Sequence, residues 1–311
     1  MKISSLTPLF AAAALAAVAI TAAGPGTPVV PVSAQPAPGP AIDASYPVVR
    51  EPAANNGDYA ADYTLYRPAD PRLVRGGLPV LVFANGSCRH LSNDELLSAE
   101  TLVAAHGFLV VAVGGYAPAE TAENGTAVPR VVTDAITWAQ VENRRPGSPL
   151  HGRIDLTRIA VAGHSCGGIE ALVAGADPRV KSVASLDSGF FADGSLGYGR
   201  ENLTKLHTPT LFLDGGPDDV AYVNSGENFE QVTVPAVRAT NPAAGHTGYW
   251  YGLRGGNPDP TIRTEAVRVL VNWLDFTLNG DRSARSYFLG QDCGLCTSPG
   301  WTVSTRNFGG R

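Results

Sequence analysis

The sequence predicts an α/β fold, in which helices cover both faces of a mostly parallel, doubly wound sheet. Three observations support this fold class. Short apolar runs recur along the chain without a polar residue at every second position, which is typical of strands buried on both faces. Segments with helical spacing separate these runs, as the crossovers between parallel strands require. With 311 residues, the chain is also long enough for one domain with a sizeable core.

The predicted elements alternate along the chain. Strands are predicted from the apolar runs at residues 78–86, 107–115, 158–165, 180–189, 208–216 and 234–241. Helical spacing predicts helices at residues 128–144, 166–174 and 261–280, and a capping box at Ser92-Asn93-Asp94-Glu95 predicts another that runs to about Ala105. The sequence contains neither an internal repeat nor a Gly-x-Gly-x-x-Gly motif at the start of a helix, so a dinucleotide-binding fold is disfavoured.

The first residues have the pattern of a secretion signal. Lys2 precedes an apolar run over residues 6–23, and Val32-Ser33-Ala34 supplies the small residues that a signal peptidase recognises. We therefore expect a signal peptide at 1–34, a flexible leader at 35–45 and one domain at 46–311. The alternatives are cleavage after Ala23 and a retained membrane anchor, but the Ala-rich run is short for a hydrocarbon layer of about 30 Å. We expect the protein to be extracellular or associated with the cell envelope, with no stable membrane span.

The composition limits the possible partners. A net charge of −5, charged residues at 16% and the lack of a Lys/Arg run disfavour nucleic acid and anionic membrane surfaces as ligands. A small, neutral or weakly polar molecule, or a lipid-like one, fits this composition better. We expect the protein to be a monomer.

The segment Gly163-His164-Ser165-Cys166-Gly167 lies where a predicted strand meets a predicted helix. Glycines two residues before and two residues after Ser165 allow the tight turn that exposes a nucleophile at the carboxyl end of a sheet. A serine in an ordinary glycine-rich loop is the alternative, but such a loop does not require a strand-to-helix junction. Ser165 is therefore the predicted nucleophile.

A nucleophilic serine needs a histidine as base and a carboxylate that orients this histidine. His246 lies in a Gly-flanked loop after the last predicted strand and is the predicted base. Asp218 and Asp219 follow the strand that ends near Asp214, and both are candidates for the acid. Asp187 is a weaker third candidate. The order Ser, Asp, His along the chain is that of an α/β-hydrolase.

The other histidines have simpler explanations. His106 follows a predicted helix, where its ring can bond carbonyl groups of the last turn. His164 occupies the variable position of the serine motif, and His90, His151 and His207 fall in loops without a supporting pattern. None of them has the place in the chain that the base requires.

Acyl transfer also needs N–H donors for the oxyanion that forms in the transition state. One predicted donor is the N–H of Cys166, and the other is that of Ser87 or Cys88, in the loop after the strand at 78–86. Two N–H groups that converge on one oxygen bring their backbones within the roughly 4.4–6.8 Å between Cα atoms that a disulfide allows. Cys88 and Cys166 are therefore a candidate disulfide pair.

The four cysteines are even in number, which fits two disulfides in a secreted protein. Cys293 and Cys296, in the motif Cys-Gly-Leu-Cys, form the second candidate pair. A redox or metal-binding role is disfavoured, because the motif lies in a Gly/Pro-rich tail without a second pair of ligands. No metal ion is expected.

Several segments together resemble a known family. "NGSC", "AAHGFLVVAVGG", "RIAVAGHSCGG", "GGPDDVAY", "GHTGYW" and "DCGLC…W" occur in an order that resembles secreted α/β-hydrolases of fungi and actinobacteria, distantly similar to the cutinase-like and polyester-hydrolase branch. The resemblance covers most of residues 78–301 and implies an α/β-hydrolase fold, hydrolysis of carboxylic esters and no cofactor. In these relatives the acid directly precedes an Ile/Val-Ala-Tyr segment, which favours Asp219 over Asp218. Polyester hydrolases tend to carry an aromatic residue where this chain has Ser87, which counts against a polymer substrate.

The predicted function is that of a secreted serine esterase that acts through an acyl-enzyme. Tyr116, after the second predicted strand, and Trp250, beside His246, are candidate substrate-binding residues, although aromatic side chains near strand ends often serve packing alone. The alternatives are a lipase, a cutinase-like enzyme or a cell-wall acyl esterase. A non-catalytic binding protein on the same scaffold is a further alternative, from a different class.

Overall fold

The computed structural model describes residues 46–93, 96–119, 125–249 and 260–309. The predicted signal peptide and leader, residues 1–45, therefore lie outside the described residues. In the described part of the chain, no helix is both long and apolar enough to cross a membrane.

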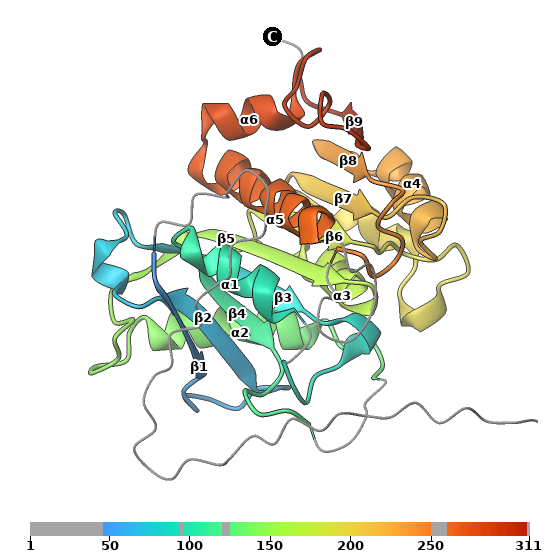
Figure 1. Cartoon of the computed structure of the whole chain (residues 1–311). Coiled ribbons are helices and arrows are strands. Elements are labelled where there is room, and N and C mark those ends of the chain that lie inside the picture. Colours follow the sequence, from blue (N-terminus) through green and yellow to red (C-terminus); the bar gives the residue numbers. More distant parts are fainter. Residues whose placement is uncertain (1–45, 94–95, 120–124, 250–259, 310–311) are drawn as a thin grey trace, which may run out of the picture. The chain divides into compact units, whose positions relative to one another are not determined.

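One mixed sheet runs through the described residues, with nine strands in the order β1-β2-β4-β3-β5-β6-β7-β8-β9 (Figure 1). The strands from β4 to β8 in this order are parallel, whereas β1, β2 and β9 pair antiparallel at the two ends of the sheet. The bounds are β1 Val48–Pro52, β2 Tyr63–Pro68, β3 Leu78–Ala84, β4 Leu109–Val113, β5 Ile154–His164, β6 Ser182–Leu186, β7 Thr210–Asp214, β8 Ala236–Thr240 and β9 Thr302–Arg306.

Helices connect the strands and lie on both faces of the sheet (Figure 1). The α-helices are α1 Leu97–Ala105, α2 Arg130–Glu142, α3 Cys166–Ala174, α4 Tyr222–Gln231, α5 Pro260–Leu274 and α6 Arg282–Phe288. Short helical turns are η1 Pro71–Leu73, η2 Gly86–Cys88, η3 Ser195–Gly197, η4 Arg200–Lys205 and η5 Asp275–Asn279, of which η5 is a π-helix. The predicted fold class, an α/β sheet covered on both faces, is confirmed.

Two hydrophobic cores form because successive side chains of a strand point to opposite faces. In β3, Val80 and Val82 belong to the core under α2 and α3, whereas Leu81 and Phe83 belong to the core under α1, α5 and α6. Strand β3 lies between β4 and β5, with Val82 opposite both Val111 and Val161. Burial on both faces explains why this strand is an unbroken apolar run.

Some elements differ from the prediction. Strands β1, β2 and β9 and helices α4 and α6 were not predicted, because their short segments mix polar and apolar residues. The predicted capping box is wrong, because α1 begins at Leu97. Ser92 instead forms an isolated bridge with Gly115, and the N–H of Asn93 donates to the Gly115 carbonyl.

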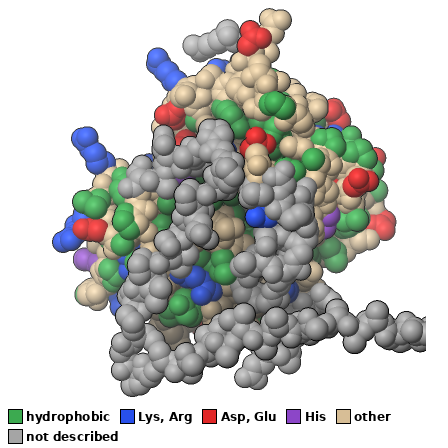
Figure 2. Space-filling view, viewed as in Figure 1, with side chains coloured by type: hydrophobic (Ala, Val, Ile, Leu, Met, Phe, Trp, Pro, Cys, Tyr) green, Lys and Arg blue, Asp and Glu red, His purple; other side chains and the backbone are tan. Residues whose placement is uncertain are grey.

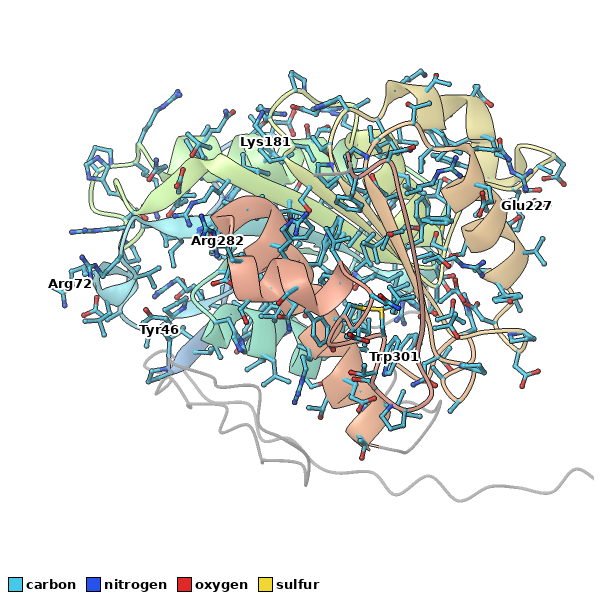
Figure 3. All side chains as sticks on the ribbon, turned by 90° about the horizontal axis from the view of Figure 1, so that it is seen from above. Tyr46, Arg72, Lys181, Glu227, Arg282 and Trp301 are labelled. Carbon is cyan, nitrogen blue, oxygen red and sulfur yellow. A yellow bond between two sulfur atoms is a disulfide. The ribbon has the colours of Figure 1, made fainter. Side chains whose placement is uncertain are left out.

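The C-terminal segment packs against the loop that follows β8. Trp301 stacks on Tyr249 with ring centroids 5.8 Å apart, and its indole N–H donates to Glu265. The Tyr249 hydroxyl donates to the carbonyl of Asp214 and accepts from the N–H of Asn241. Figure 3 shows Trp301 in this segment, whereas Arg72, Lys181 and Glu227 lie at the periphery.

The surface carries charges of both signs. On the face drawn in Figure 2, basic, acidic and apolar side chains are interspersed among the described residues. The visible part of this face shows no continuous basic stripe of the kind that nucleic acid binding requires.

A buried polar network lies between β2 and α1. Glu100 is buried, and its Oε1 accepts a hydrogen bond of 2.9 Å from the Asn93 amide. The Tyr66 hydroxyl donates to the other end of the same amide at 2.6 Å. Burial raises the pKa of the Glu100 carboxyl to about 7.

This pKa predicts a stability that depends on pH. Between the ordinary pKa of 4.5 and about 7, the unfolded chain releases a proton that the folded chain keeps. The free energy of unfolding therefore falls as the pH rises through this window, by about 3 kcal/mol from this group. Glu100→Gln should remove this dependence of the free energy of unfolding on pH. Urea unfolding of both proteins from pH 4 to 8 measures it, and two curves that stay parallel would contradict the prediction.

Candidate active site

Ser165 stands at the turn between β5, which ends at His164, and α3, which begins at Cys166. Its φ of 52° and ψ of −121° are rare for a residue with a side chain. Glycines make the turn possible, because a Cβ on Gly163 would overlap the Gly167 carbonyl. The turn presents the Ser165 hydroxyl at the carboxyl end of the sheet.

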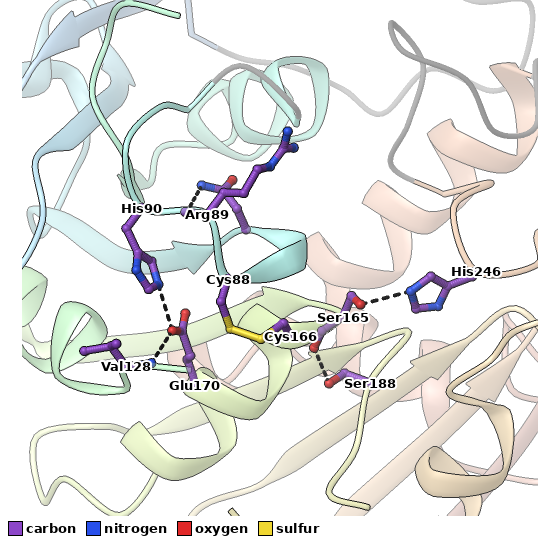
Figure 4. Close-up of a disulfide and its surroundings, with 10 residues drawn as sticks. Cys88, Arg89, His90, Val128, Ser165, Cys166, Glu170, Ser188 and His246 are labelled. Atoms are coloured by element: carbon purple, nitrogen blue, oxygen red, sulfur yellow. Dashed lines mark hydrogen bonds and ion pairs between the residues drawn. A yellow bond between two sulfur atoms is a disulfide. The ribbon is translucent and has the colours of Figure 1, made fainter. Parts of the chain in front are cut away.

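Strand β6 and the loop that follows it hold this strained turn in place. The N–H of Ser165 donates to the carbonyl of Leu186 at 2.9 Å. The Ser188 hydroxyl, in the loop after β6, donates to the carbonyl of Ser165 at 2.5 Å (Figure 4). The two peptide units that flank the Cα of Ser165 are therefore both held by hydrogen bonds.

Ser165, His246 and Asp219 lie in one hydrogen-bonded line. The Oγ of Ser165 is 3.0 Å from Nε2 of His246 (Figure 4). The Nδ1 of the same ring is 2.6 Å from Oδ1 of Asp219. This geometry lets the histidine take a proton from the serine while the carboxylate fixes its tautomer.

The Asp219 carboxyl is buried and strongly hydrogen-bonded. Its Oδ1 accepts from the N–H of Ala221 at 2.8 Å, and its Oδ2 accepts from the N–H of Gly215 at 3.1 Å. Burial alone raises the pKa of Asp219, but the hydrogen bonds from His246 and these N–H groups outweigh it, so the pKa lies below its ordinary value. The carboxylate therefore stays ionised at neutral pH.

The other aspartates after β6 and β7 have different surroundings. Asp218 is exposed at the surface. Asp214 is buried and accepts hydrogen bonds from Arg238, Ser225 and Thr240, so it fixes the ends of β7 and β8. Asp187, after β6, lies 3.8 Å from Nε2 of His164. Unlike these three aspartates, Asp219 is in hydrogen-bond contact with His246.

His164, the variable residue of the serine motif, is buried beside His246. The two rings are 5.2 Å apart, and Nε2 of His164 lies 3.0 Å from the carbonyl oxygen of His246. Burial and then the charge of His246 lower the pKa of His164 to about 3, so the ring is neutral. A carbonyl only accepts, so Nε2 carries the proton and donates it. His164 thus supports the backbone of His246.

The loop after β3 lies against the first turn of α3. Ser87 and Cys88 both adopt positive φ angles, 55° and 46°. The Cys88–Cys166 disulfide links the loop to the helix, with Cα atoms 5.1 Å apart, as predicted. Cys166 is the first residue of α3, so its N–H has no acceptor within the helix. The backbone of Ser87 faces a neighbouring segment, since its carbonyl accepts from the N–H of Gly125.

The second predicted disulfide, Cys293–Cys296, is also present. In the part of the chain that the structure describes, no group of three or more His, Cys, Asp or Glu side chains is arranged to hold a metal ion. His106 has the predicted role at a helix end, because its Nδ1 lies 2.7 Å from the carbonyl of Leu102.

Exposed apolar side chains occur in loops at the carboxyl edge of the sheet. Tyr116 is 43% exposed, and the Arg50 guanidinium lies 4.2 Å from the centre of its ring. Leu91 and Val220, in other loops at the carboxyl edge, are also exposed. Trp250, the other predicted substrate-binding residue, lies outside the described residues.

One contact near the site is not predicted from the sequence. Glu170, on α3, is fully buried, and its Oε1 lies 2.8 Å from Nε2 of His90 (Figure 4). The sequence places His90 in a loop without a supporting pattern. A glutamate in the otherwise apolar segment "GGIEALVA" is a signal of a buried polar contact, but the partner depends on the folding of a distant loop.

Comparison with known proteins gives one family. A family model described as PET hydrolase-like matches residues 56–238. The match includes Ser165 and Asp219 but ends before His246. No curated protein matches the chain.

The two disulfides should stabilise the protein unequally. Cys88–Cys166 spans a separation of 78 residues and Cys293–Cys296 one of 3, so the first removes far more loop entropy from the unfolded chain. Replacing the first pair by alanines should lower the free energy of unfolding by about 4 kcal/mol, and replacing the second by less than about 2 kcal/mol. Urea unfolding followed by tryptophan fluorescence measures both. Equal losses would show that loop closure is not the origin of the stabilisation.

Proposed function

The chain belongs to the PET hydrolase-like family, and from this premise we propose that it is a secreted serine hydrolase that cleaves carboxylic esters. The observation that carries the proposal is the line of hydrogen bonds from Ser165 through His246 to Asp219. Each residue has the type, contact and place in the fold that acyl transfer requires.

In the proposed mechanism, Ser165 attacks the ester carbonyl while His246 takes the hydroxyl proton. His246 then gives this proton to the departing alcohol, which leaves an acyl group on Ser165. A water molecule, activated by the same histidine, releases the acid and restores the serine. Asp219, ionised at neutral pH, orients the ring and stabilises its protonated form.

The oxyanion is proposed to bind two backbone N–H groups. The N–H of Cys166 is suitable because it points out of the first turn of α3, where the helix dipole also favours negative charge. The N–H of Ser87 or Cys88 supplies the second hydrogen bond. The disulfide supports this arrangement, since it keeps the two backbones close together.

The proposed substrates are small or lipid-like esters with apolar groups. The exposed side chains of Leu91, Tyr116 and Val220 offer apolar contacts at the edge where Ser165 lies. Ser87 stands where polyester hydrolases tend to carry an aromatic residue, which favours small esters over a polymer. Lipase, cutinase-like and cell-wall acyl esterase activities remain alternatives within the same chemistry. The disulfides support secretion, because such bonds persist in oxidising compartments.

The direct test is the release of p-nitrophenol from esters of increasing length, acetate to palmitate, by the mature protein and by Ser165→Ala. We expect hydrolysis by the wild-type protein and its loss in the variant, and the profile over acyl length separates an esterase from a lipase or cutinase. Labelling of Ser165 by a fluorophosphonate is the second measurement. Absence of both hydrolysis and labelling would favour the non-catalytic binding scaffold and contradict the proposal.

The two adjacent aspartates provide a matched pair of variants. Asp219→Asn should lower kcat by about four orders of magnitude, because an amide no longer fixes the correct tautomer of His246. Asp218→Asn, at the exposed neighbouring position, should leave kcat within about twofold. Steady-state kinetics with p-nitrophenyl butyrate measures both. The acid would be assigned wrongly if Asp218→Asn were the more damaging change.

A further inference from the structure

We infer, on the basis of the proposed function, that Glu170 is a positioning residue for the oxyanion loop. This loop comprises residues 85–90, between β3 and the isolated bridge at Ser92. Through His90, Glu170 fixes the orientation of the peptide units that include the N–H groups of Ser87 and Cys88. It does not touch the reacting atoms.

Glu170 makes two hydrogen bonds with one oxygen. Its Oε1 lies 2.8 Å from Nε2 of His90 and accepts from the N–H of Val128 at 2.7 Å (Figure 4). Its Oε2 is buried and receives no hydrogen bond from the residues that the structure describes. One carboxyl group thus joins α3 to the oxyanion loop and to the segment before α2.

The two attachments of the loop to α3 have matching spacings along the loop and along the helix. Cys88 bonds to Cys166, and His90, two residues later, bonds to Glu170, four residues later on the helix. Arg89 between them is extended, with φ −80° and ψ 124°. Two extended residues advance about 6.6 Å, and four helical residues advance about 6.0 Å. The loop therefore runs along α3 for one turn, attached at both ends of that turn.

The second attachment supplies what the disulfide lacks. A disulfide has several rotatable bonds between the two backbones, so it limits their distance but leaves the loop free to turn about the link. A second attachment one helical turn away removes that rotation. Ser87 and Cys88 have positive φ angles, which are unfavourable for residues with side chains. If the loop could rotate, its backbone would therefore change to a more favourable conformation.

The segment before α2 also contacts the loop. The N–H of Gly125 donates to the carbonyl of Ser87 at 2.9 Å, and a Cβ on Gly125 would overlap the carbonyl oxygen of Cys88. Val128, three residues later, is held by Glu170 itself. Glu170 therefore positions the loop directly through His90 and indirectly through this second segment.

Packing alone does not explain a glutamate at this position. The neighbouring residues of α3 are apolar and buried, and a leucine would fill the space without the cost of burying a carboxyl group. A buried polar contact is a weak source of stability but a strong determinant of geometry. The contact is thus expected to affect transition-state stabilisation more than substrate binding.

The test compares Glu170→Leu with Glu142→Leu, the same change in another buried glutamate. Glu142 lies on α2, where it bonds to Arg145 and Ser148, and it serves as the control for the general effect of losing a buried carboxylate. Glu170→Gln keeps an acceptor oxygen toward His90 and Val128, and its amide nitrogen can occupy the place of Oε2. Each variant is measured by steady-state hydrolysis of p-nitrophenyl butyrate and by amide hydrogen exchange of residues 85–90.

For Glu170→Leu we expect kcat to fall about 10- to 100-fold, as for a displaced oxyanion donor, with KM changed by less than about threefold. Exchange of the 85–90 amides should become about tenfold faster while the rest of the protein is unchanged. Glu170→Gln should restore most of kcat, and Glu142→Leu should leave kcat and the exchange of this loop as in the wild-type protein.

His90→Leu keeps the test decisive if Glu170→Leu does not fold. This variant should show the same fall in kcat, and the double variant should be no worse than either single one, because the two side chains act as one unit. A folded Glu170→Leu or His90→Leu protein with unchanged kcat would overturn the inference. So would faster exchange spread over the whole chain.

Hydrogen exchange also separates the inference from the proposed function. If the wild-type protein neither hydrolyses esters nor reacts with a fluorophosphonate, the proposed function fails. If hydrolysis is present but the 85–90 amides exchange equally in wild type and Glu170→Leu, only the positioning role fails.

Discussion

The close approach of α3 to the ends of β3 and β5 is the constraint on which the rest of the site depends. It is possible because Gly163 and Gly167 lack side chains, since a Cβ on Gly167 would overlap the carbonyl of Ala84. With the first turn of α3 against β3, the Ser165 hydroxyl, the free N–H of the helix start and the loop after β3 become neighbours. Strain at Ser165 is the local cost of this approach, and the hydrogen bonds from Ser188 and to Leu186 offset it.

His246 is supported on two sides by buried polar groups. Asp219 bonds to the ring, and His164 bonds to the backbone carbonyl of the same residue. Strand ends in turn hold Asp219 and His164. Asp219 accepts a hydrogen bond from an N–H group of the loop after β7, and His164 is the last residue of β5. His246 thus lies in a loop, but residues at the ends of the sheet strands fix its position.

The parts of this molecule that could be predicted from sequence are those with a local signal. The central strands are apolar runs because burial on both faces demands it. The tight turn at Ser165 can be read from the sequence because Gly163 and Gly167 leave the space that the turn needs. The order of Ser165, Asp219 and His246 along the chain is the one expected for such a sheet, and the three side chains are in hydrogen-bond contact. The antiparallel strands at the sheet ends lack an apolar run, and the start of α1 depends on the bridge between Ser92 and Gly115. Glu170 and His90 meet only after two distant segments have folded, so no local pattern could pair them.

The disulfide between Cys88 and Cys166 can form only at a certain stage of folding. Its two sulfur atoms come within bonding distance only when the loop after β3 has reached the start of α3, so oxidation records that these two parts of the chain have met. In a reducing compartment this disulfide does not persist. In an oxidising compartment, one covalent step fixes the Ser165 turn and the loop after β3 in their assembled positions.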